Sequence, residues 1–305
     1  MNLVQTHTEI IDDAPIKTWF GAGGNADRLC RPADAASAAW CVQRFEGIRV
    51  LGDGANLLVA DRGVDGLVLD LSQLNEVSID NDTGFVRAGA GANLPKLILQ
   101  TVRKGLGGLE TLAGIPASVG GAAIMNAGGR FGEFGDTVSA VEIINDHGEI
   151  VRLIRSEIEF GYRHSGLAGV VIAVEFALIP DDPAEVRDRL KSCMAYKKTS
   201  QPLGAHSAGC CFRNPMLTEE IDGIGQPGDR VSAGMLLDKA GCKNMRIGNA
   251  VVSDEHANFL ISEKGATASD LRALMSAAAR RVEDHFGVQL NREVVIWDRD
   301  SGASR

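Results

Sequence analysis

Residues 112–129 form the feature that most constrains how this chain can fold. Their sequence, LAGIPASVGGAAIMNAGG, leaves a stretch of backbone with few bulky side chains. A helix that begins near Ser118 would present free N–H groups and the positive end of its dipole, an arrangement that suits a pyrophosphate. Close packing of a helix on small residues explains the same pattern equally well. The whole chain is also rich in glycine, with 36 copies in 305 residues.

A second glycine-bearing loop lies at residues 50–58, with the sequence VLGDGANLL. Consecutive backbone N–H groups in such a turn can form a nest for phosphate oxygens. An ordinary loop between two strands is the alternative. The loop is not a Rossmann fingerprint, because Leu57 stands at the position of the third glycine and no helix follows.

The remaining pattern predicts a mixed α+β chain. Asn93 is the expected N-cap of a helix with Pro95 in its first turn, and residues 267–270 resemble a capping box. The acidic and proline-containing break at 181–183 is the best candidate domain boundary. Helices are expected at 35–45, 93–104, 183–198, 235–240 and 268–285. Strands are expected at 48–51, 67–71, 76–79, 85–88, 138–144, 149–154, 170–179, 258–262 and 294–297.

Composition excludes several classes of protein. The net charge of −9 argues against non-specific nucleic-acid binding, which needs a basic surface. No apolar stretch is long enough to cross a membrane, and the N-terminus lacks a signal-peptide pattern, so we expect a cytoplasmic protein. The six cysteines include no C-x-x-C pair and are expected to be reduced thiols rather than metal ligands.

Residues 207–215, SAGCCFRNP, place Cys210 in a small, flexible segment shortly before Arg213 and Asn214. Adjacent cysteines are more often unreactive core residues. Residues 187–213 nevertheless carry six basic residues against one acidic residue. A solvated helix face explains most such runs, but Lys197 and Lys198 could also steer an anionic substrate toward the thiol.

In order and spacing, these motifs resemble the UDP-N-acetylenolpyruvoylglucosamine reductases. The resemblance covers nearly the whole chain, and eight motifs in the family's order make it specific. The matching segments are 18–26, 52–58, 112–128, 161–163, 207–215, 233–238, 253–259 and 293–294.

The resemblance implies a two-lobed FAD-binding domain of the vanillyl-alcohol-oxidase (PCMH) type, followed by an α+β substrate-binding domain. The expected lobes span 1–71 and 72–182, the substrate domain spans 183–289, and residues 290–305 return to the flavin. The expected FAD contacts are Gly52, Gly54, Ala55, Asn56, Leu57, Gly114, Ile115, Pro116, Gly120, Gly121, Ala122, Asn126, Gly128 and Ile172.

The chemistry implied by the family has two half-reactions. NADPH reduces FAD, and the flavin then delivers hydride to the enolpyruvyl group of UDP-N-acetylglucosamine enolpyruvate, giving UDP-N-acetylmuramate for peptidoglycan. Arg163 would be a fixed cation beside the substrate carboxylate, and Glu293 an acid that needs a raised pKa. The expected substrate-binding residues are Tyr162, Lys198, Arg213, Asn214 and Lys243.

Cys210 departs from the pattern of many family members, which carry serine as the proton donor at this position. A thiol, with a reference pKa of ~8.5, is a better acid than an alcohol. Neighbouring cations favour thiolate, so we expect part of Cys210 to be ionised and sensitive to peroxide, with Cys211 facing the core.

A second departure concerns residues 164–169. Some members insert a tyrosine-bearing loop here, but six residues leave no room for it, which indicates a loop-less subtype with a more open channel.

We expect a monomer that binds neither nucleic acid nor membranes. The alternatives are another flavin oxidase or dehydrogenase acting on a hydroxy acid or sugar lactone, and a non-catalytic UDP-sugar-binding flavoprotein.

Overall fold

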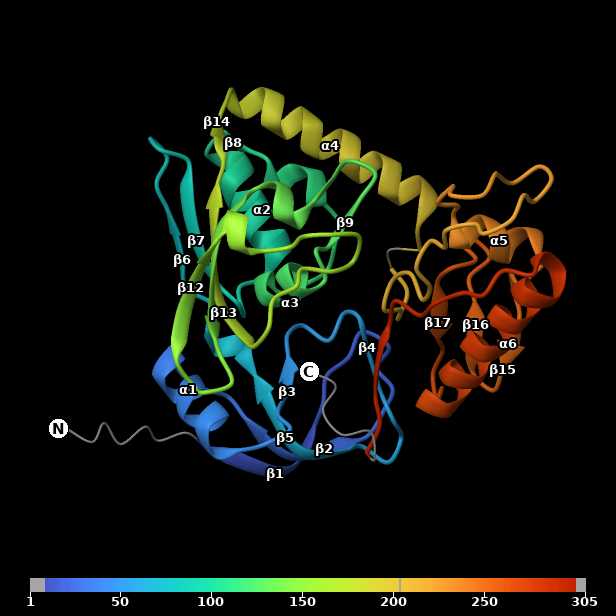
Figure 1. Ribbon diagram of the computed structural model, residues 1–305, viewed down its shortest axis with the longest axis horizontal. Coiled ribbons are helices and arrows are strands. Elements are labelled where there is room, and N and C mark those ends of the chain that lie inside the picture. The colour runs from blue at the N-terminus through green and yellow to red at the C-terminus, as the bar shows by residue number, and fades with distance from the viewer. Residues whose placement is uncertain (1–8, 203, 300–305) are drawn as a thin grey trace.

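The computed structural model describes residues 9–202 and 204–299, which form two sheet-containing lobes and a third, smaller α+β unit (Figure 1). The helices are α1 (Ala35–Arg44), α2 (Leu94–Arg103), α3 (Val119–Ile124), α4 (Pro183–Ser200), α5 (Ala233–Lys239) and α6 (Ala268–Phe286). All the helices expected from the sequence are present, α3 included, although it has only six residues.

The first lobe is built on a four-stranded sheet in the order β1-β2-β5-β3. Its strands are β1 (Ile10–Pro15), β2 (Asn25–Cys30), β3 (Arg49–Leu51) and β5 (Val64–Asp70). β1 and β2 are antiparallel, whereas β5 pairs in parallel with both β2 and β3. The chain therefore leaves β3 at the edge of this sheet and enters the loop at 52–56 directly.

The second lobe is a five-stranded antiparallel sheet in the order β12-β11-β13-β7-β6. Its strands are β6 (Val77–Ile79), β7 (Phe85–Gly89), β11 (Val138–Ile144), β12 (Ile150–Ile154) and β13 (Val170–Ala177). Helices α2 and α3 lie on the same side of this sheet in Figure 1. Short pairs, β8 (Leu106–Gly107) with β14 (Ile179–Pro180) and β9 (Gly128–Gly129) with β10 (Gly132–Glu133), complete the lobe.

Helix α4 packs on the second lobe rather than on the third unit. Val186 is fully buried in the core of the second lobe, and Leu190 packs against that core. Arg189 forms a 2.8 Å ion pair with the buried Glu110. We expected a domain boundary near residue 183. In the structure, however, α4 packs on the second lobe, and the chain leaves that lobe only after α4. The proline break was misleading because it starts a helix without changing the core to which that helix belongs.

The third unit contains a small antiparallel sheet, β15-β16-β17, covered by α5 and α6. Its strands are β15 (Arg246–Ile247), β16 (Ala250–Val252) and β17 (Leu260–Ser262). Phe20 and Leu58, from the first lobe, are buried in the core of this unit. Asp61 also accepts hydrogen bonds from the backbone N–H groups of Ala268 and Ser269 at the start of α6.

The C-terminal segment returns from the third unit to the first lobe. β18 (Val295–Trp297) pairs in parallel with β4 (Leu57–Val59), and Figure 1 shows the red segment beside β4. We expected residues 290–305 to return to the flavin; of these, residues 300–305 lie outside the described part of the chain. Within residues 9–202 and 204–299, no helix combines the length and apolar character needed to cross a bilayer.

Candidate active site

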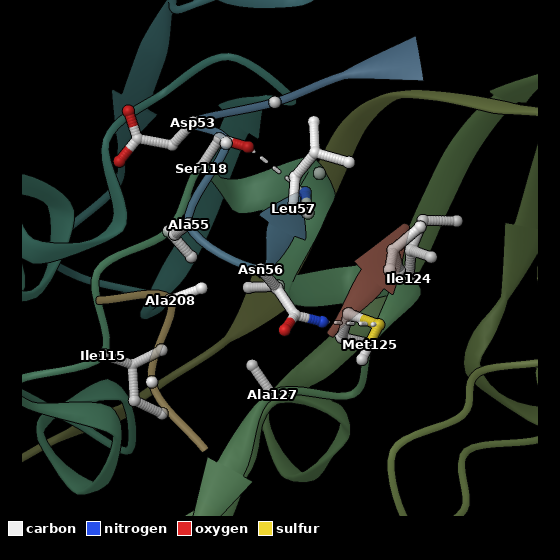
Figure 2. A pocket seen from close by; sticks show the side chains of 18 of the residues that line it. Asp53, Ala55, Asn56, Leu57, Ile115, Ser118, Ile124, Met125, Ala127 and Ala208 are labelled. Atoms are coloured by element: carbon white, nitrogen blue, oxygen red, sulfur yellow. Dashed lines mark hydrogen bonds between the residues drawn. The ribbon is translucent and has the colours of Figure 1, made fainter. Parts of the chain in front are cut away.

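A cavity of about 1230 Å³ lies where the three parts of the molecule meet. Typical ligand pockets measure about 300–1,000 Å³, so this one has room for more than one small ligand. The loop at 52–56 and helix α3 line it, as do the segment 207–210 and Glu293. In Figure 2, Asn56 reaches from the loop toward Met125, with Ile115 and Ala208 on another side of the space.

The loop at 52–56 offers unused backbone donors to this cavity. Gly54 has a φ of +64°, and a Cβ there would lie 2.2 Å from the carbonyl oxygen of Lys17, so glycine is required. Within the described residues, no protein oxygen accepts a hydrogen bond from the N–H groups of residues 53–56. Free N–H groups around a left-handed glycine form a nest that suits phosphate oxygens.

The start of α3 does not provide such donors, and the expectation of free N–H groups there is wrong. The N–H of Val119 donates to the carbonyl of Ala92 and that of Gly120 to the carbonyl of Ala90, at 2.9 and 2.8 Å. The N–H of Gly121 donates to the N-cap oxygen of Ser118 at 3.2 Å. A Cβ at Gly120 would lie 2.7 Å from Cβ of Ala90. The small residues of α3 therefore serve close packing, and the unused backbone N–H groups lie on the other loop.

Arg163 and Glu293 form the charged end of the cavity. Nε of Arg163 donates to Oε1 of Glu293 at 2.7 Å, and Nη2 donates to the carbonyl of Gly128 at 2.9 Å. Arg163 has a φ of +55°, a conformation that costs a non-glycine residue about 1–3 kcal/mol and often occurs at functional sites. Burial raises the pKa of Glu293 above its usual value, and the Arg163 charge offsets only part of that effect.

Cys210 lines the cavity close to this pair. The backbone N–H of Glu293 donates to the carbonyl of Cys211 at 2.8 Å, so the two segments run side by side. Burial raises the pKa of the Cys210 thiol to about 12; Glu293 adds to the shift, and Arg163 and Lys197 oppose it. The expectation that part of Cys210 is thiolate is therefore wrong, because desolvation raises the pKa of the thiol more than the nearby cations lower it. Cys211 is fully buried in the core of the third unit.

Most of the residues expected at the site line this cavity. They are Gly52, Gly54, Ala55, Asn56, Leu57, Gly114, Ile115, Pro116, Gly120, Gly121, Ala122, Gly128, Arg163, Cys210 and Glu293. They come from both lobes, the third unit and the C-terminal segment, so the sequence motifs converge only in the folded chain.

Two residues expected to contact the cofactor have structural positions instead. Asn126 is buried, and its side-chain amide donates to Glu133 and to the carbonyl of Gly161, so it braces the turn that carries Arg163. Ile172 is buried in the core of the second lobe. Neither is among the residues that line the cavity, whereas Val170 and Val171 are.

Lys198 is exposed on α4 and lies outside the lining, whereas Lys197 is buried and lines the cavity. Burial lowers the pKa of Lys197 to about 8. Helical spacing could have identified it, because Val186, Leu190, Cys193 and Lys197 follow one face of the helix. Ser207 was not expected at the site, but its buried hydroxyl lines the cavity without a hydrogen-bond partner in the described part of the chain.

The other expected substrate-binding residues lie outside the cavity lining. The hydroxyl of Tyr162 accepts a hydrogen bond from the N–H of Asn214 at 3.0 Å, and the guanidinium of Arg230 lies 4.1 Å from the Tyr162 ring centre. Lys243 pairs with Asp238 at 2.9 Å. Nε of Arg213 is buried without a partner in the described residues.

Comparisons with known proteins agree with this architecture. The family model "UDP-N-acetylenolpyruvoylglucosamine reductase, C-terminal domain" matches residues 201–297, and the model "FAD binding domain" matches residues 29–154. The start of the first match agrees with a boundary after α4.

Similar proteins extend over nearly the whole chain. UDP-N-acetylenolpyruvoylglucosamine reductase from Moorella thermoacetica is 38% identical over 297 residues, which cover 95% of this chain and 93% of that protein. Reductase 2 from Symbiobacterium thermophilum is 39% identical, with 93% and 90% coverage. The crystal structure of the Thermus caldophilus reductase superposes with a TM-score of 0.79 at 36% identity, covering 96% of this chain and 99% of that one. This chain therefore belongs to the UDP-N-acetylenolpyruvoylglucosamine reductase family.

Proposed function

We propose that this chain reduces UDP-N-acetylglucosamine enolpyruvate to UDP-N-acetylmuramate for peptidoglycan synthesis, with NADPH as the reductant and FAD as the cofactor. The observation that carries this proposal is the meeting of Arg163, Cys210 and Glu293 at one cavity. These three side chains come from the second lobe, the third unit and the C-terminal segment, and they supply a fixed cation, a neutral thiol and a carboxyl with a raised pKa.

The loop at 52–56 supports the fit of FAD to this cavity. The free N–H groups of the loop and its left-handed Gly54 suit a diphosphate, and the cavity runs from this loop to the Arg163–Glu293 pair. When bound, FAD would supply the transfer of hydride from NADPH to the terminal carbon of the enolpyruvyl group.

The residues at the charged end account for the rest of the reaction. Arg163, held by Glu293 and Gly128, stabilises the charge that develops on the substrate carboxylate. Glu293 donates a hydrogen bond to the same carboxylate when it is protonated, which its raised pKa favours. The Cys210 thiol stays protonated at neutral pH and donates its proton to the carbon next to that carboxylate.

The substrate's charged groups have nearby partners. Lys197 and the hydroxyl of Ser207, which has no hydrogen-bond partner among the described residues, line the cavity, and we assign them to the UDP-sugar. We also propose Tyr162, Lys198, Arg213, Asn214 and Lys243, which lie outside the cavity lining, as substrate contacts. The six residues 164–169 connect Arg163 to β13 without a helix or strand, which supports the loop-less subtype.

We further propose that the protein is a cytoplasmic monomer. Light scattering would test this by measuring its mass in solution.

The test separates the two half-reactions under anaerobic conditions. NADPH should bleach the absorbance of the bound flavin, and the enolpyruvyl UDP-sugar should then restore it, with UDP-N-acetylmuramate as the product. Reduced flavin that persists after the substrate is added would contradict the proposal. Rapid reoxidation by oxygen alone, with turnover of a hydroxy acid, would favour an oxidase instead.

A further inference from the structure

The side chain of Asn258 is joined by two hydrogen bonds to the backbone of a residue near Cys210. Its Oδ1 accepts from the N–H of Phe212 at 2.9 Å, and its Nδ2 donates to the carbonyl of Phe212 at 2.8 Å. The backbone carbonyl of Asn258 also accepts from the N–H of Cys211 at 2.8 Å. Asn258 is only 2% exposed, so water does not compete for these bonds.

The segment held by Asn258 carries the thiol of Cys210 and is hydrogen-bonded to the segment that carries the carboxyl of Glu293. Cys210 precedes the two bonded residues directly, and it forms a β-bridge with Phe259. On the other side of the same segment, the carbonyl of Cys211 accepts from the N–H of Glu293 at 2.8 Å. Asn258 is thus hydrogen-bonded to the two residues that follow Cys210, and one of them, Cys211, is hydrogen-bonded to Glu293.

We propose that Asn258 is a positioning residue that sets the placement of the Cys210 thiol and the Glu293 carboxyl in the cavity. The assignment rests on the proposed function of these two groups. Among side chains that are uncharged at neutral pH, asparagine and glutamine offer an acceptor and a strong donor in the geometry of a peptide group, as Phe212 requires. Without them, the segment 210–212 loses its fixed position, and a displacement of about 1 Å at reacting groups can cost about 10²-fold in rate.

The first experiment uses Asn258→Leu, which keeps the branching of the side chain at Cγ but removes both bonds. We expect reoxidation of the reduced flavin by the enolpyruvyl substrate to slow by about 10²-fold. The rate of flavin reduction by NADPH should remain close to that of the wild type, because that step needs neither acid. Leu274→Ala is the matched control, since it removes packing from the same core of the third unit but removes none of the hydrogen bonds that hold residues 210–212.

Loss of stability alone predicts another result. In that case Asn258→Leu and Leu274→Ala would affect both half-reactions alike once the folded fractions are equal. That outcome, or reoxidation of Asn258→Leu at the wild-type rate, would overturn the inference.

A second variant, Asn258→Asp, applies if Asn258→Leu does not fold. A protonated aspartic acid has one donor and one acceptor, as the amide has, whereas the ionised form cannot donate to the carbonyl of Phe212. The reoxidation rate of Asn258→Asp, divided by the wild-type rate at the same pH, should therefore rise as the pH falls. A ratio that does not change with pH would refute the assignment.

Amide hydrogen exchange gives a readout without turnover. In the flavin-free protein, Asn258→Leu or Asn258→Asp at high pH should exchange the N–H groups of Phe212 and Glu293 faster than wild type, while α6 keeps its protection. Unchanged exchange at both amides would refute the inference even if the enzyme reaction is as proposed. Wild-type protein that cannot be reoxidised by the substrate would instead refute the proposed function.

Discussion

At the scale of single residues, burial controls the chemistry of Cys210. Its pKa of about 12 leaves the thiol protonated at neutral pH and available as an acid. Cys210→Ser should keep substantial activity, because an alcohol can donate a proton from the same position. Cys210→Ala should still allow NADPH to reduce the flavin but slow reoxidation by the substrate about 10²–10⁴-fold, the usual loss when an acid is removed. Stopped-flow absorbance measures both steps, and normal turnover of the alanine variant would remove Cys210 from the mechanism.

The same protonation state predicts resistance to oxidants and alkylating agents. Because the thiolate is the reactive form, a Cys210 pKa of about 12 leaves little of it at neutral pH. Iodoacetamide should modify Cys210 slowly at pH 7 and faster as the pH rises, which peptide mass spectrometry can follow. Cys210→Ser should show about the same loss of activity on peroxide treatment as wild type. A much more resistant serine variant would instead show that thiolate forms readily in the pocket.

Glu293 predicts the pH dependence of the second half-reaction. Burial raises its pKa, so the carboxyl remains protonated to a higher pH than an exposed glutamate. If this acid supports the substrate carboxylate, reoxidation is fast below the raised pKa and slows as the pH increases through it. Glu293→Gln cannot ionise but still donates a hydrogen bond, so its rate should be lower and independent of pH over that range. If Glu293→Gln shows the same pH dependence as wild type, the pH dependence arises from another group.

Sequence motifs identified the reacting residues but not the residues that hold them. Arg163, Cys210 and Glu293 stand in motifs that resemble a known family, so they could be named before the fold was known. Asn258 could not be assigned a role in this way, because its partner Phe212 lies 46 positions earlier in the chain. The degree of burial of Cys210 was also inaccessible, and it reversed the expected ionisation.

At the scale of elements, the contact between the loop at 52–56 and α3 shapes the proposed FAD site. A Cβ at Gly52 would lie 2.4 Å from Oγ of Ser118. Gly52→Ala should therefore push the loop away from α3 and weaken FAD binding at least about tenfold, or ~1.4 kcal/mol. Fluorescence quenching of added FAD by the flavin-free protein measures this affinity.

A double-mutant cycle tests the cause of that loss. Ser118→Ala removes the clashing oxygen, at the cost of the α3 N-cap, which is worth about 0.5–2 kcal/mol of stability. Gly52→Ala with Ser118→Ala should bind FAD more tightly than Gly52→Ala alone. If the second substitution gives no recovery, the contact with Ser118 is not what excludes a side chain at Gly52.

Strong local signals made some elements predictable. Asn93 and the Thr267–Asp270 capping box do mark the starts of α2 and α6, and both helices have a buried face. β15 and β16 gave no comparable signal, because they contain two and three residues and depend on the covering helices. The role of the first turn of α3 was also hidden, since its N–H partners, Ala90 and Ala92, are distant in sequence.

At the scale of the whole molecule, the resemblance to the family implied two lobes, a substrate domain and a C-terminal segment that returns to the flavin. It did not show which lobe α4 packs on, because that depends on the partner of its buried face. It also did not reveal that Phe20 and Leu58 of the first lobe complete the core of the third unit. These contacts join residues from different motifs, so they cannot be predicted from the pattern of residues along the sequence.

The joint between the first lobe and the C-terminal segment predicts that FAD binding stabilises both. The carbonyl of Asn56 accepts from the N–H of Val295 at 3.0 Å, and its side-chain amide donates to the carbonyl of Glu293 at 3.0 Å. A ligand bound by the loop at 52–56 therefore orders the segment that carries Glu293. Ligand that binds only the folded state at 100 times its Kd adds about 2.7 kcal/mol of stability. The thermal midpoint should rise with FAD concentration, and exchange at residues 295–297 should slow.

Two variants distinguish this coupling from general stabilisation. Asn56→Ala removes the bond to Glu293 but keeps the backbone bond to Val295, so saturating FAD should slow exchange at 295–297 less than in wild type. Asp61→Ala is the matched control, because it cuts the separate joint between the first lobe and α6. It should lower the thermal midpoint yet keep the full effect of FAD on β18. Equal protection of β18 by FAD in Asn56→Ala and wild type would show that the Asn56 side chain does not transmit the binding of the cofactor to Glu293.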